Sequence, residues 1–292
     1  MGKLTISLDF ELGWGAIESE KWEERQRNYI YEDFRIVFKR FLSLLDDLEI
    51  PLTWATVGAM ISNPTKTDFE HLPPVFMNRA VQFLNNAKPL TKDGRDLFES
   101  LLSMRTQQDI GLHSFSHTRF LEESFSVESK LVDLKKGQES LLKYGVQPKS
   151  FVFPVNQVSN LDLLSQVGIE VARIPPKISS RNVGKLSEAL LGQTPTARRC
   201  KVQSDLYTEA GSMLFNWRGK KLRKLLINHQ VGLGLSKATR SDYHFHLWLH
   251  PFNLAEIPGL ESGLYKLLKK AAGLRDEGKI DIVSMSEIRE SH

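Results

Sequence analysis

Lys3-Leu-Thr-Ile-Ser-Leu-Asp9 and Pro51-Leu-Thr-Trp-Ala-Thr-Val57, together with the segment that joins them, decide the fold of this 292-residue chain. Both stretches are short and apolar and include β-branched residues, the pattern of a buried strand. Between them, Asp33 is the expected N-cap of a helix that ends near Leu48. Its apolar residues recur at helical spacing: Phe34, Val37, Phe38, Phe41, Leu42, Leu45 and Leu48. Strand, helix and strand in this order form the unit of a parallel sheet.

The same alternation continues along most of the chain. Further strands are expected at 108–113, 150–154, 168–173, 244–250 and 279–283, and helices near 75–86, 127–143, 160–167 and 260–276. A capping-box pattern predicts a short helix from Ser284. Residues 62–96 and 175–241 are expected to be irregular insertions, the second with one or two helices. We therefore expect one α/β domain over residues 1–292, a barrel-like fold whose active site lies at the C-terminal strand ends.

The composition excludes several classes of protein. The chain is 41% hydrophobic and 25% charged with a net charge of +4, which is ordinary for a globular protein and gives no sign of nucleic-acid binding. Its one cysteine, Cys200, cannot form an internal disulfide and is expected to be structural. No signal-peptide pattern and no apolar run of about 18 residues is present, so we expect a cytoplasmic protein without a transmembrane segment.

His113-Ser-Phe-Ser-His117 places two imidazoles four residues apart at the end of an expected strand. On a helical turn they would share one face and bind one metal ion together. Two histidines rarely complete a metal site, and a carboxylate from Asp9 or Glu11 is the expected third ligand. Such a site leaves one position open for water, and the second carboxylate can then act as base. The residues alone leave open which carboxylate takes which role.

The expected strand 244–250 carries further imidazoles. It puts His244, His246, Trp248 and His250 on one face, and His244 is expected to pack in the interior. His250, at the strand end, is a natural general acid because a small shift places its pKa near neutrality. Asp9, His113, Pro154–Asn156 and His250 all fall at expected C-terminal strand ends, so a common site on one rim is predicted.

Five motifs, in order from about residue 4 to residue 288, resemble those of the polysaccharide deacetylases of the NodB type. They are Ser7-Leu-Asp-Phe-Glu-Leu-Gly-Trp-Gly15, Thr53-Trp-Ala-Thr-Val-Gly58, Asp109-Ile-Gly-Leu-His-Ser-Phe-Ser-His117, Ser150-Phe-Val-Phe-Pro-Val-Asn-Gln157 and His246-Leu-Trp-Leu-His-Pro-Phe-Asn253. The second motif is similar to that of a branch linked to bacterial surface-polysaccharide synthesis.

The resemblance implies a distorted (β/α) barrel with seven or so parallel strands and one divalent metal ion, usually Zn²⁺. It implies removal of an acetyl group from an N-acetylated or O-acetylated sugar or polysaccharide precursor. The roles it assigns are catalytic base for Asp9, metal ligand for Glu11, His113 and His117, and catalytic acid for His250. It also implies that Pro154, Asn156 and Trp248 line the substrate groove.

One residue departs from the family's pattern. The arginine that usually follows the proline of the fourth quoted motif, and orients the base, is replaced by Val155. Arg173, at the end of the next expected strand, is our candidate for the missing cation. Two alternatives stay open: a catalytically impaired barrel that binds a glycan or a protein, and a hydrolase of a non-sugar C–N bond such as a cyclic amide.

Overall fold

The computed structural model describes residues 1–292 except 20, 177–196, 198, 203–205, 241 and 289–292. The described part contains one curled sheet of ten strands in the order β6-β7-β5-β4-β3-β2-β1-β9-β8, with β10 paired to β1. All pairs are parallel except β6 with β7, which confirms the expected barrel-like, mostly parallel α/β fold. The strands are β1 (Gly2–Phe10), β2 (Thr53–Thr56), β3 (Asp109–Leu112), β4 (Ser150–Val152), β5 (Val171–Ile174), β6 (Arg199–Lys201), β7 (Tyr207–Ala210), β8 (Met213–Leu214), β9 (His244–Leu249) and β10 (Ile280–Ile282).

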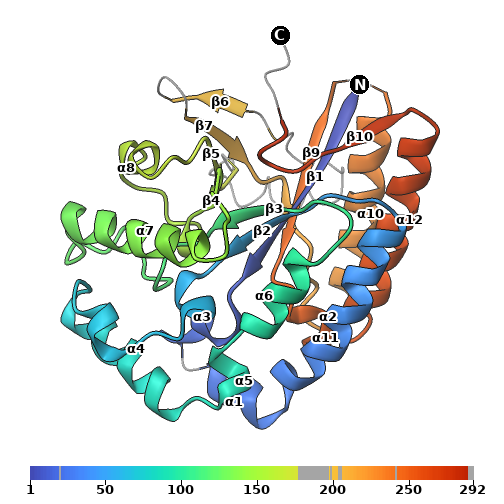
Figure 1. Cartoon of the computed structure of the whole chain (residues 1–292). Coiled ribbons are helices and arrows are strands. Elements are labelled where there is room, and N and C mark those ends of the chain that lie inside the picture. The colour runs from blue at the N-terminus through green and yellow to red at the C-terminus, as the bar shows by residue number, and fades with distance from the viewer. Residues whose placement is uncertain (20, 177–196, 198, 203–205, 241, 289–292) are drawn as a thin grey trace.

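Helices cover the outside of the sheet, and Figure 1 shows α2, α10 and α12 along one side and α7 on the other. The α-helices are α1 (Lys21–Arg27), α2 (Ile30–Asp47), α3 (Gly58–Ser62), α4 (Pro74–Asn86), α5 (Pro89–Lys92), α6 (Arg95–Leu102), α7 (Val127–Leu142), α8 (Asp162–Gln166), α10 (Lys221–Ala238), α11 (Asn253–Glu256) and α12 (Leu260–Asp276). Three 3₁₀ turns are η1 (Leu12–Ala16), η2 (Lys66–Phe69) and η3 (Pro154–Asn156). None of the described helices is both long and apolar enough to cross a bilayer.

The strand β1 pairs with three other strands of the sheet. Its residues alternate between apolar side chains that face the helices and polar ones that face the inside of the curl. One edge pairs with β9, and the other pairs first with β10 and then with β2. Outside the sheet, Phe10 meets Phe38 of α2 and Trp54 of β2 with ring centroids 5.5–5.7 Å apart. This aromatic contact fixes α2 against the strands that carry the polar face.

The structure corrects several local expectations. Helix α2 begins after Tyr29, which has φ of 58°, so Asp33 lies in its first turn and is not the N-cap. Residues 285–287 form a turn, not a helix, although the backbone N–H of Ser284 donates to Glu287 as a capping box requires. The segment 62–96 is largely helical. Within 175–241 the described residues form β6, β7, β8 and α10, and the remainder of that prediction lies outside the described residues.

A hydrogen-bonded carboxylate joins four segments at the end of the sheet opposite the site predicted above. Oδ2 of Asp109 accepts from the hydroxyls of Thr53 (2.9 Å) and Ser150 (2.5 Å) and from the backbone N–H of Ser286 (3.2 Å). Burial raises the pKa of Asp109 in spite of these donors, which favour the charged form. The hydrogen bonds of Asp109 therefore link β2, β4 and the C-terminal segment to β3. Burial of its carboxylate away from water opposes this stabilisation.

The pKa of Asp109 predicts a pH-dependent effect of Asp109→Asn on stability. A raised pKa means that the folded protein holds the proton more tightly than the unfolded chain. The contribution of Asp109 is therefore largest below the ordinary aspartate pKa of about 3.9 and is lost as pH rises through the folded-state pKa. We expect the wild type to lose free energy of unfolding relative to Asp109→Asn over that range, measured by urea denaturation. Asp47→Asn, at an exposed position, is the control; a difference independent of pH would contradict the prediction.

Candidate active site

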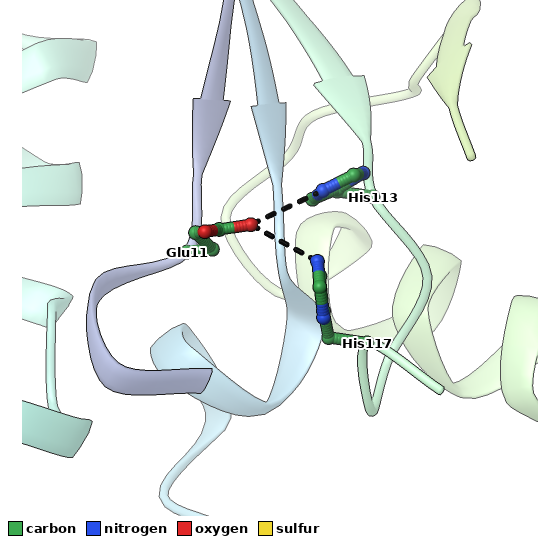
Figure 2. A group of neighbouring side chains, drawn as sticks. All are labelled: Glu11, His113 and His117. Carbon is green, nitrogen blue, oxygen red and sulfur yellow. Dashed lines mark ion pairs between the residues drawn. The ribbon is translucent and has the colours of Figure 1, made fainter. Parts of the chain in front are cut away.

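Three predicted metal ligands converge where β1 and β3 end (Figure 2). Oε2 of Glu11, which directly follows β1, lies 3.0 Å from Nε2 of His117 and 3.4 Å from Nε2 of His113. The ligand atoms of all three residues lie within 4.8 Å of one another. All three residues are buried. Ligands about 2.1 Å from a tetrahedral ion are about 3.4 Å apart, so one divalent ion fits this group with little movement.

Two atoms of this group have unmet bonding capacity. Oε2 of Glu11 and Nε2 of His113 are buried and make no hydrogen bond of good geometry with the described residues. Buried polar atoms are normally satisfied, and an exception calls for an explanation such as a missing ion. A metal ion would satisfy both atoms. The structure therefore supports a metal centre formed by Glu11, His113 and His117.

The two imidazoles are held in different ways. His113 directly follows β3, and its Nδ1 donates to the carbonyl of Val152 at 2.7 Å, which leaves Nε2 free for a metal ion. The spacing predicted that His113 and His117 lie on one helical turn. In the structure they lie on a loop instead. Both Ser114 and His117 have φ of 59°, and the Ser114 hydroxyl accepts from the His117 backbone N–H at 3.0 Å. This serine turn folds the loop back, so that the ring centroids lie 4.8 Å apart.

Glu11 is positioned by the tight turn η1. A Cβ atom built on Gly15 would lie 1.9 Å from Oε1 of Glu11, so no larger residue fits at position 15 without displacing the carboxylate. Burial favours the neutral form of Glu11, but the charges of His250 and His117 outweigh it and hold the pKa of Glu11 well below its usual range. The carboxylate is therefore ionised and anionic, as a metal ligand must be.

A buried ion pair lies beside this group. Burial favours the neutral form of Asp9, but the charge and hydrogen bonds of Arg173 outweigh burial and lower the pKa of Asp9. Nη1 of Arg173 donates to Oδ1 of Asp9 at 2.7 Å, and Nη2 donates to Oδ2 at 2.8 Å. Such a two-point contact fixes both the charge and the orientation of the carboxylate. The cation that meets Asp9 thus comes from β5, whereas Val155 is 52% exposed with φ of 55°.

Sequence reasoning missed the residues that support Arg173. Nη1 of Arg173 also donates to the Ser7 hydroxyl at 2.8 Å, and that hydroxyl lies 2.8 Å from Nε2 of His246. Nδ1 of His246 lies 2.5 Å from the fully buried Glu209 carboxylate of β7. Because a carboxylate cannot donate, Nδ1 carries the proton, and in the neutral imidazole Nε2 accepts from Ser7. His244 and His246 face inward on β9, and this pattern in the sequence could have indicated a buried acidic partner such as Glu209.

His250 directly follows β9, and its imidazole lies close to the carboxylates of Glu11 and Asp9. Its Nε2 lies 3.4 Å from Oε1 of Glu11 and 3.8 Å from Oδ2 of Asp9. Its side chain is 27% exposed, whereas those of the two carboxylates are 4–5% exposed. His250 is therefore the group of this cluster that a molecule from solvent meets first.

Trp248, Asn156 and Pro154 were also predicted to line the substrate groove, and each of them has other protein groups as neighbours. Arg173 lies over the ring of Trp248 at 4.6 Å and also donates from Nη2 to Oδ1 of Asn156 at 3.3 Å. One face of Trp248 thus supports the arginine. Pro154 is buried at the start of η3.

A cavity of about 570 Å³ opens beside the carboxylates. Glu11 and His250 line it, whereas none of Pro154, Asn156 and Trp248 does. Its walls include Gly15, Arg25, Asn216, Arg218 and Phe252. The size is that of a typical small-ligand pocket.

No family model matches the sequence, and no curated protein matches it. Solved structures do match. A protein from Mycobacterium smegmatis, provisionally assigned as a polysaccharide deacetylase, aligns over 98% of this chain and 87% of its own, with a TM-score of 0.63 and 13% identity. A GH57-type branching enzyme from Pyrococcus horikoshii aligns over 100% and 71%, with a TM-score of 0.58 and 13% identity. PuuE allantoinase aligns over 98% and 88%, with a TM-score of 0.57 and 10% identity.

This chain shares the fold of these proteins. At 10–13% identity the likeness extends to the fold and not to the reaction. A deacetylase, a branching enzyme and an allantoinase carry out different reactions, so the fold alone does not identify the function of this chain.

The metal centre predicts a specific loss on removing one imidazole. We expect His113→Ala to lower the affinity for Zn²⁺ by more than about 100-fold, because loss of a ligand exceeds the 10–100-fold effect of losing a residue behind one. Calorimetric titration of Zn²⁺ into the metal-free protein measures this. His229→Ala, on an exposed part of α10, is the matched control and should bind as the wild type does. Equal affinities in both variants would rule out this centre.

The ion pair predicts a pH-dependent loss of stability. Arg173→Gln leaves Asp9 charged and buried, so we expect a loss of about 3–5 kcal/mol in the free energy of unfolding of the metal-free protein at neutral pH. Because the paired Asp9 has a lowered pKa, its contribution is present above the unfolded-state pKa and is lost as pH falls through the folded-state pKa. The deficit should therefore shrink in acid. Arg173→Lys keeps the charge and should lose less; a pH-independent deficit would argue against the pairing.

Proposed function

We propose that this protein is a metal-dependent hydrolase that removes an acetyl group from an acetylated sugar. The observation that carries the proposal is the convergence of Glu11, His113 and His117, with Asp9 and His250 beside them. Three protein ligands leave a coordination position open, which is the arrangement of catalytic and not of structural zinc sites. Zn²⁺ is the ion we propose. Held there, it would lower the pKa of a bound water to about 7 and polarise the acetyl carbonyl.

Asp9 is the proposed general base. It is ionised because Arg173 outweighs the effect of burial on its pKa, and its two oxygens are held in a fixed plane by the guanidinium. Oδ2, the oxygen nearer His250, can accept the proton of the attacking water. The pairing makes Asp9 a weaker base than a free buried carboxylate but keeps it ready at neutral pH.

His250 is the proposed general acid. Its Nε2 lies near both carboxylates, and it borders the cavity in which a substrate would lie. In that position the imidazole can donate a proton to the leaving nitrogen or oxygen when the acetyl bond breaks. Base and acid are thus separate groups, Asp9 on β1 and His250 directly after β9, with 3.8 Å between Oδ2 of Asp9 and Nε2 of His250.

The motifs support an acetylated sugar, N-acetylated or O-acetylated, in bacterial surface-polysaccharide metabolism. Their resemblance to polysaccharide deacetylases covers every residue in the proposed roles, and the fold likeness to the provisionally assigned Mycobacterium smegmatis protein agrees with it. The binding-module alternative rested on Val155, and the contact of Arg173 with Asp9 supports the enzyme by giving the base a cationic partner.

A second candidate is hydrolysis of a cyclic amide. The likeness to PuuE allantoinase favours it, since that protein has the same fold with a TM-score of 0.57. The metal, base and acid would have the same roles on a ring amide. Only the released product separates the two candidates.

We expect acetate release from at least one member of a panel of N-acetylated and O-acetylated sugars, measured with an enzyme-coupled acetate assay on the Zn²⁺-loaded protein. Asp9→Asn and His250→Gln should each lower kcat/KM by about 10²–10⁴-fold, the usual contribution of a general base or acid. Asp47→Asn, at an exposed position, is the control and should be unchanged.

Metal content must be measured for each variant, so that loss of activity is not loss of the ion. Undiminished acetate release from Asp9→Asn with full metal would refute the assigned mechanism. Ring opening of a cyclic amide without acetate release from any sugar would favour the second candidate instead.

A further inference from the structure

The segment 218–225, at the start of α10, carries five cations and two exposed leucines, and we call it the 218–225 surface. Its sequence is Arg218-Gly-Lys-Lys-Leu-Arg-Lys-Leu225, without an acidic residue. None of its cations, which are Arg218, Lys220, Lys221, Arg223 and Lys224, forms an ion pair with a described residue. Burial, and then the charge of Arg218, lower the pKa of Arg223, in keeping with two cations that lie close together. The surface is strongly and uniformly positive.

The apolar part of this surface is equally unusual. Leu222 is 71% exposed and Leu225 is 68% exposed, the highest exposures among the large hydrophobic residues of the described chain. Three residues apart on a helix, they lie on the same face. That face is not the one that packs on the sheet, where Ile227, Val231 and Leu235 are buried. Two leucines flanked by cations therefore project into solvent with no role in the core.

Lys224 lies over the ring of Trp217 at 5.1 Å, but the positive charges of the segment do not stabilise the N-terminus of α10. The first turn contains no acidic residue, and the N-cap Lys220 makes no side-chain cap. Positive charges at a helix N-terminus oppose the helix dipole and weaken the helix. The buried face of α10 offsets this cost. A charge pattern that weakens its own helix, next to exposed leucines, indicates a binding surface.

We propose that the 218–225 surface docks on an anionic phospholipid bilayer, with its cations at the headgroups and Leu222 and Leu225 in the acyl boundary. Basic residues beside exposed leucines are the pattern of helices that lie in a membrane interface. Phosphate groups of a nucleic acid would use the cations but not the leucines. A second copy of the chain would bring two sets of like charges together. Only the bilayer uses both parts of the surface.

Docking there has a geometric consequence. Arg218 and Gly219 line the same cavity as Glu11 and His250. A bilayer bound to the 218–225 surface would therefore lie at the edge of that cavity. The docking itself does not depend on the proposed reaction, and its test needs no turnover.

The test is sedimentation of the full chain with vesicles of phosphatidylcholine alone or mixed with phosphatidylglycerol. We expect binding only to the anionic vesicles, and weaker binding as salt rises. Each cation near such a membrane contributes about fivefold to binding, so Lys220→Glu with Lys221→Glu should lower the partition coefficient by more than about twentyfold. Leu222→Ser with Leu225→Ser should lower it by at least about tenfold, from loss of apolar burial.

The matched control is Lys269→Glu with Lys270→Glu, which makes the same change in net charge on an exposed part of α12 and should bind as the wild type does. Circular dichroism checks that each variant is folded. Equal loss in this control would show attraction to net charge only. Absence of vesicle binding, with a leucine-dependent dimer by ultracentrifugation or with tighter binding to RNA, would overturn the proposal in favour of a second copy or a nucleic acid.

Discussion

The buried polar face of β1 is the constraint on which the site depends. Thr5, Ser7 and Asp9 point into the curl of the sheet, where they are buried and need hydrogen-bond partners. Each is satisfied by a residue from a strand distant in sequence: Thr5 by His244 at 3.0 Å, Ser7 by His246 at 2.8 Å, and Asp9 by Arg173. These contacts hold β1 and β9 at the spacing that brings His250 to the carboxylates. The interior of the curl is thus a hydrogen-bonded network, and the candidate site is its open end.

Much of this could be predicted from the sequence, because parallel strands bring residues at their C-terminal ends to one rim. The strands that contain Asp9 or lead to His113 and His250 were recognisable by their short apolar runs. Glu11 and His117 lie close after Asp9 and His113 in the sequence. Local patterns therefore predicted the two histidines with a carboxylate from Asp9 or Glu11, and the family resemblance indicated Glu11. The detail of the site could not be predicted in this way: the loop from His113 to His117 is shaped by two residues with positive φ and a serine hydrogen bond, which no periodicity reveals.

What the sequence could not show is contact between segments far apart in the chain. Arg173 was recognisable as a cation near a strand end, but its two-point contact with Asp9 depends on β5 and β1 curling toward each other across the sheet. Glu209 was hidden in a segment without clear periodicity, and only its burial beside His246 gives it meaning. Buried charge pairs are decided by tertiary packing, so composition and spacing predict their members more readily than their pairing.

The pairing of β1 also bears on how the chain reaches its native state. This strand leaves the ribosome before every other strand of the sheet, yet two of its three partners, β9 and β10, are made last. Contacts between such distant segments close slowly, because a long loop must be ordered before they form. During synthesis β1 would pair with β2 alone, leaving its polar inner face without His244, His246 and Arg173. The candidate site is therefore one of the last features to form, and an incomplete sheet of this kind is prone to misassociation until its last strands are made.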